Sequence, residues 1–181
     1  INYEGKHYLN IDLIIPKQMS PGTHYVLCLD RSGSMGCEAT VKDSTGLESS
    51  QGLSYLKVAI HAMKVFISSL NSNDLVSIVI FDTDSLVIEN AIEFNNNEKI
   101  RIFNNLDSIK PGGSTDLEGG LKDCFNICGN YSQLNNRIII FTDGRPNSCS
   151  KSWDRILKDY SELYNISPTI DTIGFSNNIQ E

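Results

Sequence analysis

The chain has 181 residues, 40% of them hydrophobic and 20% charged, which is enough for one substantial core and typical of a single domain. Its formal net charge of −7 argues against nucleic acid and anionic membrane surfaces as partners, because both bind basic surfaces. No apolar run is long enough to cross a bilayer, so no direct membrane insertion is expected. The first residues do not resemble a secretory leader and the chain begins at Ile1, so we expect a fragment of a longer protein.

The first third of the chain predicts two strands and a long helix. Partial alternation at 6–16 predicts an additional edge strand. The continuous apolar run at 24–30 is typical of a strand buried on both faces at the centre of a sheet. Residues 37–52 are polar and have little to bury, so we expect a long mobile loop. Apolar residues at helical spacing then predict an amphipathic helix over 53–70.

The rest of the chain continues the alternation of strands and helices. Its middle predicts a buried strand at 74–82, an edge strand at 86–94, a helix at 97–109 and a helix at 116–130. Its end predicts a buried strand at 137–143, a helix at 152–164 and a final strand at 169–175. Thr115, followed three residues later by Glu118, matches a capping box that would open the helix at 116–130.

This alternation predicts an α/β fold with a doubly wound, mainly parallel sheet and helices on both faces. We expect one domain over 1–181, with an N-terminal extension at 1–23, a core at 24–175 and a C-terminal segment at 176–181. Ligands of such sheets bind beyond the carboxyl ends of the strands, where the winding reverses. Asp30 and Asp143 each end a buried strand, and they would face one crevice if those strands are neighbours.

The stretch DRSGS predicts a cation site. Asp30, Ser32 and Ser34 alternate, which directs three oxygens to one side of a loop, and Gly33 permits a tight backbone. Magnesium takes oxygen ligands in octahedral geometry at about 2.0–2.1 Å and keeps several waters. If the hydroxyls bind directly and the aspartates act through waters, the cation keeps much of its charge. Such a site should recruit an anionic oxygen from outside.

Three segments, DRSGS, GGSTD and TDGRPN, resemble in this order the metal-ion-dependent adhesion site of von Willebrand factor type A domains. NDLVSIVIFDT and IDTIGF also resemble that family's second and penultimate strands, so the resemblance covers nearly the whole chain. It implies a Mg²⁺ site, open to Mn²⁺ or Ca²⁺, in which a protein partner's Asp or Glu carboxylate completes the coordination. The implied metal residues are Asp30, Ser32, Ser34, Thr115 and Asp143.

The resemblance also implies a role for each residue. Ser32, Ser34 and, in the ligand-engaged state, Thr115 would contact the metal directly, while Asp30 and Asp143 would hold its waters. Whether Ser114 joins Thr115 stays open. Each residue alone has a structural explanation, since Asp-Gly is a common turn and threonine a common helix cap. Only their joint occurrence on the family's strands points to a metal site.

The chain departs from the family pattern in two places. The connection at 37–52 is longer and more polar than usual. The chain also stops at Glu181, shortly after TIGF, where the family's fold would continue into a last helix and strand. Either the domain is truncated or its final strand is absent, and the strand at 6–16 would then cover surface that the missing segment leaves open.

The sequence gives little support to an enzymatic function. The chain has neither a dinucleotide fingerprint nor a phosphate-binding Gly-Lys-Ser or Gly-Lys-Thr loop. A serine hydrolase needs a histidine base, yet His7, His24 and His61 all lie in the N-terminal third. A magnesium-dependent hydrolase is the less favoured alternative, because no second metal cluster or general base stands out. We expect the domain itself not to be an enzyme, although the full-length protein could carry an enzymatic or ubiquitin-ligase segment elsewhere.

Two cellular locations of the domain, intracellular and extracellular, stay open. DLVSIVIFD and GGSTDLEGGL resemble intracellular eukaryotic members of the family, copine-like or ubiquitin-ligase-associated, and an extracellular adhesion domain is the alternative. The odd number of cysteines is a poor disulfide framework and favours a reducing compartment; they are Cys28, Cys37, Cys124, Cys128 and Cys149. We therefore expect a monomeric cytoplasmic domain, with the extracellular space or cell surface as the alternative.

Overall fold

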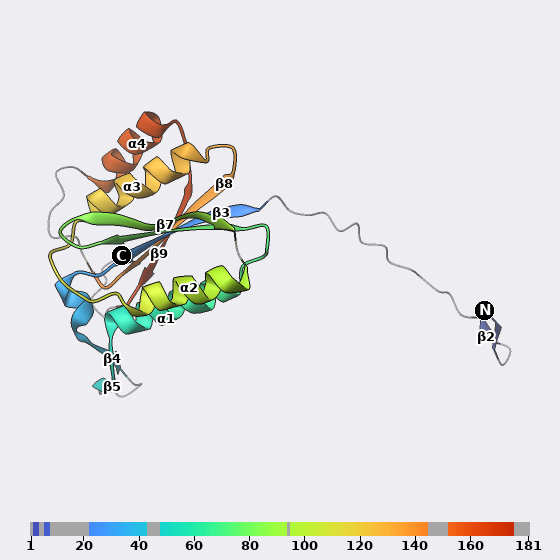
Figure 1. Cartoon of the computed structure of the whole chain (residues 1–181), viewed down its shortest axis with the longest axis horizontal. Helices are drawn as coiled ribbons and strands as arrows, with labels where there is room; N and C mark the ends of the chain where they lie inside the picture. The colour runs from blue at the N-terminus through green and yellow to red at the C-terminus, as the bar shows by residue number, and fades with distance from the viewer. Residues whose placement is uncertain are drawn as a thin grey trace.

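The computed structural model describes residues 2–3, 6–7, 22–42, 48–93, 95–144 and 152–175. A five-stranded sheet in the order β7-β6-β3-β8-β9 lies between two layers of helices (Figure 1). Its strands are β3 (Thr23–Asp30), β6 (Leu75–Phe81), β7 (Ser85–Glu93), β8 (Asn135–Thr142) and β9 (Thr169–Gly174). The helices are α1 (Tyr55–Ser68), α2 (Asn96–Asp107), α3 (Leu117–Asn130) and α4 (Trp153–Tyr164).

The predicted fold class is confirmed. β3 pairs in parallel with β6 on one side and with β8 on the other, and only β7 runs antiparallel within this sheet. Because β6 follows β3 through α1 and β8 joins the opposite side, the winding reverses between β3 and β8. The carboxyl ends of these two strands carry Asp30 and Asp143, so the expected crevice lies between neighbouring strands.

Continuous apolar runs form the central strands because the sheet is covered on both faces. α1 and α2 lie on one face and α3 and α4 on the other (Figure 1). Alternate residues of β3 point to opposite faces, so that Leu27 and Leu29 pack toward α1 and α2, whereas Val26 and Cys28 pack toward α3. Burying each such side chain contributes about 1.5–3 kcal/mol.

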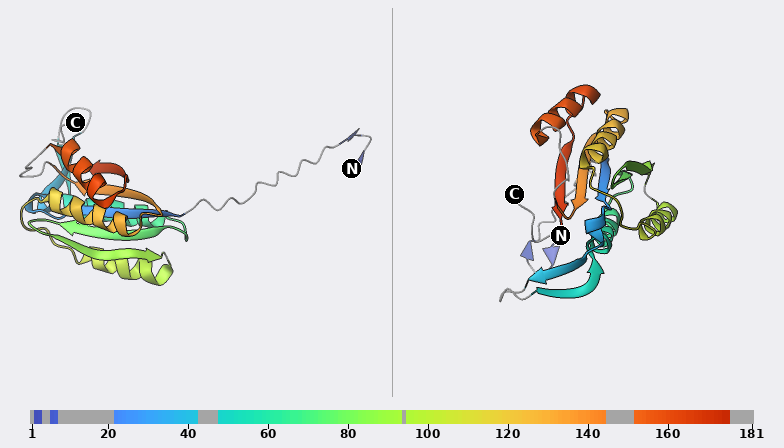
Figure 2. Two further views of the ribbon diagram at one scale, coloured as in Figure 1. Left: turned by 90° about the horizontal axis from the view of Figure 1, so that it is seen from above. Right: turned by 90° about the vertical axis from the view of Figure 1, so that its left-hand side faces the viewer.

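The connection after β3 contains regular structure, so the prediction of an irregular loop at 37–52 is wrong. A short 3₁₀ helix, η1 (Gly33–Gly36), leads into an antiparallel hairpin of β4 (Glu38–Lys42) and β5 (Glu48–Ser54) that projects beside α1 (Figure 2). The Tyr55 N–H donates to the Cys37 carbonyl at 3.0 Å and closes its base. The β-branched pair Thr40 and Val41 carried a strand signal that the polar composition obscured.

The predicted capping box at Thr115 is also wrong. The N-cap of α3 is Asp116, whose carboxylate accepts the Gly119 N–H at 3.0 Å. The Asp116 N–H donates to the Asp82 carbonyl at 2.7 Å, which fixes residue 116 at the helix start. Aspartate caps a helix as well as threonine does, so the structure uses the later residue and leaves the Thr115 hydroxyl outside the cap.

The end of the sheet opposite Asp30 contains a buried hydrogen-bonded network. The His24 ring bonds through Nδ1 to Asn136 Oδ1 at 2.8 Å and through Nε2 to Ser77 Oγ at 2.9 Å. The Asn136 amide nitrogen donates to backbone carbonyls, so its oxygen accepts and Nδ1 carries the proton. The Ser77 hydroxyl then donates to Nε2 and accepts the Ala91 N–H at 2.7 Å. Burial lowers the pKa of His24, and the hydrogen bond to Asn136 opposes that shift only in part.

The strand predicted at 86–94 lies at the edge of the sheet as β7, and it is irregular. Its register against β6 shifts near Ser77, and Ala91 has a left-handed φ of 47°. Glu89 points inward from β7 and is buried, where it accepts two hydrogen bonds of 2.7 Å from Arg101 of α2. The edge is therefore kinked and carries an inward-facing charge that is paired.

The structure covers only part of the regions to which the remaining expectations apply. Cys28, Cys124 and Cys128 are buried and Cys37 is exposed, all as free thiols, whereas Cys149 lies outside the described residues. The edge strand expected at 6–16 lies mostly outside them too; β2 (Lys6–His7) pairs with β1 (Asn2–Tyr3). Within the described ranges, no helix combines the length and apolar character that a bilayer crossing requires.

Candidate metal site

Three loops meet at the carboxyl edge of the sheet, and backbone hydrogen bonds hold them together. Two hydrogen bonds join the loop after β3 to the segment before α3. The Gly33 N–H donates to the Gly113 carbonyl at 3.1 Å, and the Gly112 N–H donates to the Arg31 carbonyl at 2.8 Å. The bond from Asp116 to Asp82 ties the same segment to the end of β6. The segment before α3 is thus fixed against the ends of both β3 and β6.

Asp30 is fully buried and its carboxylate is held by two donors. Oδ1 accepts the Ser32 N–H at 2.8 Å, and Oδ2 accepts the Thr142 hydroxyl at 2.7 Å. Such charge-assisted bonds compensate the loss of water around a buried carboxylate. Thr142 is not among the residues predicted from the sequence, although its place directly before Asp143 at the end of a buried strand was a usable signal.

Ser34 and Asp143 lie across the crevice from each other and are in contact. The Ser34 hydroxyl donates to Asp143 Oδ1 at 3.1 Å, and Ser32 Oγ lies 3.2 Å from Ser34 Oγ. Ser32 is buried, Ser34 is exposed and Asp143 is half-buried, so this row of oxygens runs from the interior to solvent. The structure therefore brings together Asp30, Ser32, Ser34 and Asp143, which are four of the five predicted residues.

Thr115 lies in the adjoining segment before α3. It is buried, with 8% of its surface exposed, and its neighbours Ser114 and Asp116 are both anchored by backbone bonds. Among the described residues, no hydrogen bond links the Thr115 hydroxyl to Asp30, Ser32, Ser34 or Asp143. Ser114 is exposed, and its N–H donates to Thr83 Oγ1 at 3.0 Å.

The two aspartates give the site uncompensated negative charge. Partial burial raises the pKa of Asp143, the charge of Asp30 adds to that rise, and the hydrogen bond from Ser34 opposes it. Arg31 follows Asp30 directly but pairs with Asp82 at 2.7 Å. No lysine or arginine in the described part of the chain forms an ion pair with Asp30 or Asp143. A bound cation would relieve this charge.

The donor set fits a hard cation that prefers oxygen. Octahedral ligands at 2.0–2.1 Å from Mg²⁺ lie about 2.9 Å from one another. The separation of 3.2 Å between Ser32 Oγ and Ser34 Oγ, the two hydroxyls expected to contact the cation directly, is close to that spacing, and Asp143 Oδ1 lies 3.1 Å from Ser34 Oγ. In the described ranges no group of three or more His, Cys, Asp or Glu side chains could hold a metal, so the donors here are two carboxylates supplemented by hydroxyls.

Gly113 shapes the segment that carries Thr115. Its φ is +71°, and a Cβ at this position would lie 2.7 Å from Thr83 Oγ1 and 2.9 Å from Asp82 Cγ. Both the backbone conformation and the close approach require glycine. At Gly112 a Cβ would meet nothing within 4 Å, so only the second glycine of the pair is sterically required.

Comparisons with known proteins agree with this architecture. The family model described as von Willebrand factor type A domain matches residues 25–145. No curated protein matches the chain. A von Willebrand factor type A protein from Catenulispora acidiphila is 18% identical with a TM-score of 0.66, the alignment covering 86% of this chain and 34% of that one.

Two further solved structures are similar. The PilB minor pilin from Streptococcus sanguinis is 17% identical with a TM-score of 0.63, over 90% of this chain and 52% of the pilin. An aerotolerance-related membrane protein from Bacteroides fragilis is 17% identical with a TM-score of 0.61, over 84% of this chain and 67% of that one. The chain thus spans about a third of the Catenulispora protein and about half of the pilin. At these identities the likeness shows the fold alone.

Proposed function

Since this chain belongs to the von Willebrand factor type A domain family, we propose that it is a metal-dependent protein-binding module. In this proposal, Asp30, Ser32, Ser34, Thr115 and Asp143 hold Mg²⁺, which Mn²⁺ or Ca²⁺ can replace. The cation supplies an open coordination position for an Asp or Glu carboxylate of a protein partner. The neighbouring loops then contact the partner's surface around that carboxylate and determine which partner is bound.

One contact supports this proposal above all others. The hydrogen bond from Ser34 to Asp143 joins residues 109 positions apart, from the ends of two neighbouring strands. Loops after neighbouring parallel strands lie close together in any such sheet, so the support comes from the kind of groups that meet here, a hydroxyl and a carboxylate, which are both oxygen ligands. Their contact favours a shared ligand, and an oxygen-seeking cation satisfies both groups.

The environment of each residue suits its proposed role. Both oxygens of Asp30 already accept a protein hydrogen bond, so this buried carboxylate is oriented and is suited to accept further bonds from metal-bound water. Ser34 is exposed and can present its hydroxyl to a cation directly. The cation would contact mainly neutral hydroxyls and would reach the two carboxylates through water. It would therefore keep enough positive charge to attract a carboxylate from a partner.

Neither histidine with a described side chain is positioned to act as the base of a hydrolase at this site. His24 is buried at the start of β3, at the opposite end of that strand from Asp30, and His61 is exposed on α1. Neither described histidine side chain contacts the candidate ligands. This arrangement supports a binding role for the domain, and any enzymatic activity of a longer protein would then reside elsewhere.

We place the module in the cytoplasm, in a copine-like or ubiquitin-ligase-associated protein, with an extracellular adhesion domain as the alternative. The free thiols of the four described cysteines support a reducing compartment. The flanking sequence separates the two settings. A RING, U-box or C2 segment would favour the first, and a leader or membrane span would favour the second.

Calorimetric titration with Mg²⁺ and Mn²⁺ tests the metal site. Ser34→Ala should weaken binding about 10- to 100-fold, because it removes an exposed donor without disturbing the core. Ser72→Ala, in the exposed turn before β6, is the matched control and should bind as the wild type does. Thr115→Ala and Ser114→Ala would decide which hydroxyl contributes. Equal affinity in wild type and Ser34→Ala would refute the site.

Acetate provides a separate test of carboxylate binding. Titrated into the Mg²⁺-loaded protein, it should shift amide resonances of the loops around Gly33 and Gly144, and it should have no effect after chelation. Equal shifts with and without metal would contradict the proposed mechanism while leaving the metal site itself intact.

A further inference from the structure

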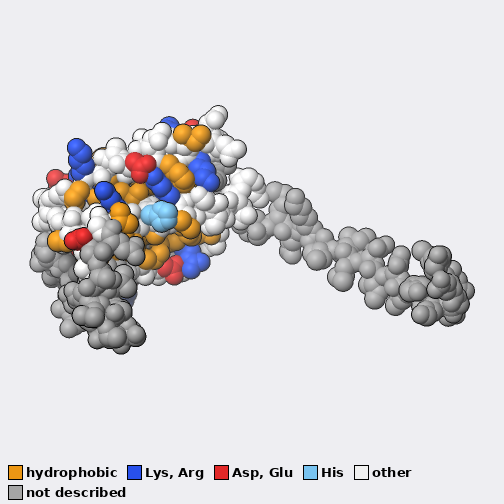
Figure 3. Space-filling view, turned by 90° about the horizontal axis from the view of Figure 1, so that it is seen from below, with side chains coloured by type: hydrophobic (Ala, Val, Ile, Leu, Met, Phe, Trp, Pro, Cys, Tyr) orange, Lys and Arg blue, Asp and Glu red, His pale blue; other side chains and the backbone are white. Residues whose placement is uncertain are grey.

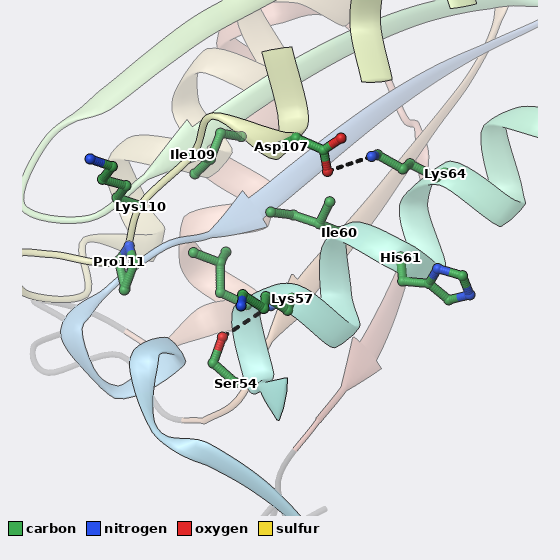
Figure 4. A pocket seen from close by; sticks show the side chains of 10 residues that line it. Ser54, Lys57, Ile60, His61, Lys64, Asp107, Ile109, Lys110 and Pro111 are labelled. Atoms are coloured by element: carbon green, nitrogen blue, oxygen red, sulfur yellow. Dashed lines mark hydrogen bonds and ion pairs between the residues drawn. The ribbon is translucent and has the colours of Figure 1, made fainter. Parts of the chain in front are cut away.

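A groove about 480 Å³ in volume lies between α1 and the segment that follows α2 (Figure 4). We call it the α1 groove and define it by an apolar floor of Leu56, Ile60 and Ile109 and a basic rim of Lys57, Lys64 and Lys110. It contains none of the five proposed metal residues. We propose that the α1 groove binds an acidic segment of a partner protein that carries one or two bulky apolar side chains, and that it does so without a cation.

The floor of the groove is apolar and belongs to the core. Leu56 and Ile60 are part of the hydrophobic core beneath α1, with 2% and 6% of their surfaces exposed, and Ile109 packs against the same cluster. These side chains are held by the core before any ligand arrives. Entry of an apolar side chain therefore needs no reorganisation of the groove.

The rim of the α1 groove is basic, although the chain as a whole is acidic. Lys57 and Lys110 are exposed, and among the described residues neither forms an ion pair. Lys64 pairs with Asp107 at 2.5 Å, which leaves the rim with a net positive charge, whereas the whole chain carries −7. Figure 3 shows Lys or Arg side chains, a histidine and apolar surface together on the face seen from below, with a few Asp or Glu side chains among them. Charge complementarity therefore selects an acidic partner segment.

The size of the groove limits what enters it. A volume of about 480 Å³ admits a few side chains and not a folded domain, so the inserted part is a short segment with apolar anchors flanked by Asp or Glu. An anionic membrane surface is a poorer match. It is flat where this site is concave, and it would be repelled by the net charge of −7 on the rest of the chain.

The groove adjoins the metal loops. Its lining at Lys110 and Pro111 continues directly into Gly112, whose N–H donates to the Arg31 carbonyl at 2.8 Å. A partner that inserts here would lie beside the loops that carry the proposed cation site. One partner could therefore contact both sites, although each has its own chemistry.

A displayed library of random dodecapeptides, selected against the wild-type chain in the presence of EDTA, tests the proposal. We expect the enriched peptides to combine Asp or Glu with Leu, Ile, Phe or Trp. The double variant Lys57→Glu, Lys110→Glu should bind the enriched peptides at least about tenfold more weakly, because two attractions become repulsions. Raising the salt concentration should weaken wild-type binding as well.

The matched control is Lys122→Glu, Lys158→Glu, which makes the same change in net charge on α3 and α4. It should retain wild-type affinity, and unchanged melting temperatures would show that both double variants fold. Enrichment without acidic residues, equal loss in both double variants, or binding to phosphatidylserine vesicles in place of peptides would overturn the proposal. Because EDTA is present throughout, failure here leaves the metal site untouched, and failure of the metal site leaves this binding intact.

Discussion

Two aspartates that end neighbouring strands have different environments. Asp30 is fully buried and receives hydrogen bonds from Ser32 and Thr142, whereas Asp143 is half-buried and receives one from Ser34. The raised pKa of Asp143 means that its charged form is less favourable in the folded chain than in water. Without a cation, therefore, ionised Asp143 lowers the stability of the fold above its unfolded pKa.

Asp143→Asn should separate stability from metal binding. The amide keeps an oxygen that accepts from Ser34 but removes the charge, so in EDTA at pH 7 the melting temperature should be equal to or above that of the wild type. Magnesium at about 100 times the wild-type Kd should stabilise the wild type by about 2.7 kcal/mol and should stabilise the variant clearly less. Asp154→Asn, on exposed α4 surface, should keep the full magnesium effect. A large loss of stability in EDTA would show that the charge supports the fold.

At the scale of elements, the segment before α3 depends on one glycine. Gly113 has φ +71° and faces Thr83 and Asp82 at distances that exclude a Cβ. Gly113→Ala should therefore cost about 1–3 kcal/mol of unfolding free energy and weaken metal binding, because the displaced segment carries Thr115. Gly112→Ala is the matched control and should stay within about 0.5 kcal/mol of the wild type. Urea denaturation and calorimetry measure both effects, and equal behaviour of the two variants would contradict this account.

The β4–β5 hairpin extends away from the sheet, and its base is closed by the bond from Tyr55 to Cys37. Replacing residues 38–50 with a short Gly-Ser connection should leave the melting temperature within about 3 °C of the wild type, since the described side chains among them, at 38–40, belong to neither main core cluster. Metal affinity should also be retained, while affinity for a protein partner changes. A collapse in melting temperature would show that the hairpin stabilises α1.

At the scale of the whole molecule, the stability of the fold should depend on pH through His24. Its folded pKa lies below 6.5, so between the folded and unfolded pKa values the unfolded chain binds more protons and stability rises with pH. The contribution is present above about pH 6.5 and is lost as the pH falls below it. Protonated Nε2 would also lose its hydrogen bond from Ser77.

Urea midpoints between pH 7.5 and 5.0 measure this dependence. His24→Gln should be less stable at pH 7.5 and should show a smaller loss on acidification. His61→Gln, on the exposed surface of α1, should keep the wild-type slope. A wild-type midpoint that does not fall below pH 6.5 would contradict the role assigned to His24.

Most of the fold could be predicted from the sequence because its central strands are short continuous apolar runs rich in Val and Ile, which are typical of a sheet covered on both faces. Asp30 and Asp143 were placed in one crevice by the reversal of the winding, and the contact between Ser34 and Asp143 agrees with that placement. Features that depend on three-dimensional neighbours were missed. Thr142 matters only because Asp30 lies beside it, and Asp116 displaced Thr115 as the cap because Asp82 accepts its N–H.

The irregular edge strand β7 has a consequence for how the domain behaves in a crowded solution. An open strand edge offers unpaired backbone groups to another copy, and exposed Leu86 and Val87 would favour such stacking. The left-handed Ala91 interrupts the run of backbone groups, and inward-facing Glu89 is a charge that a flat, growing sheet could not easily enclose. These two residues should therefore keep the domain soluble, and straightening the edge would open a route to fibrils.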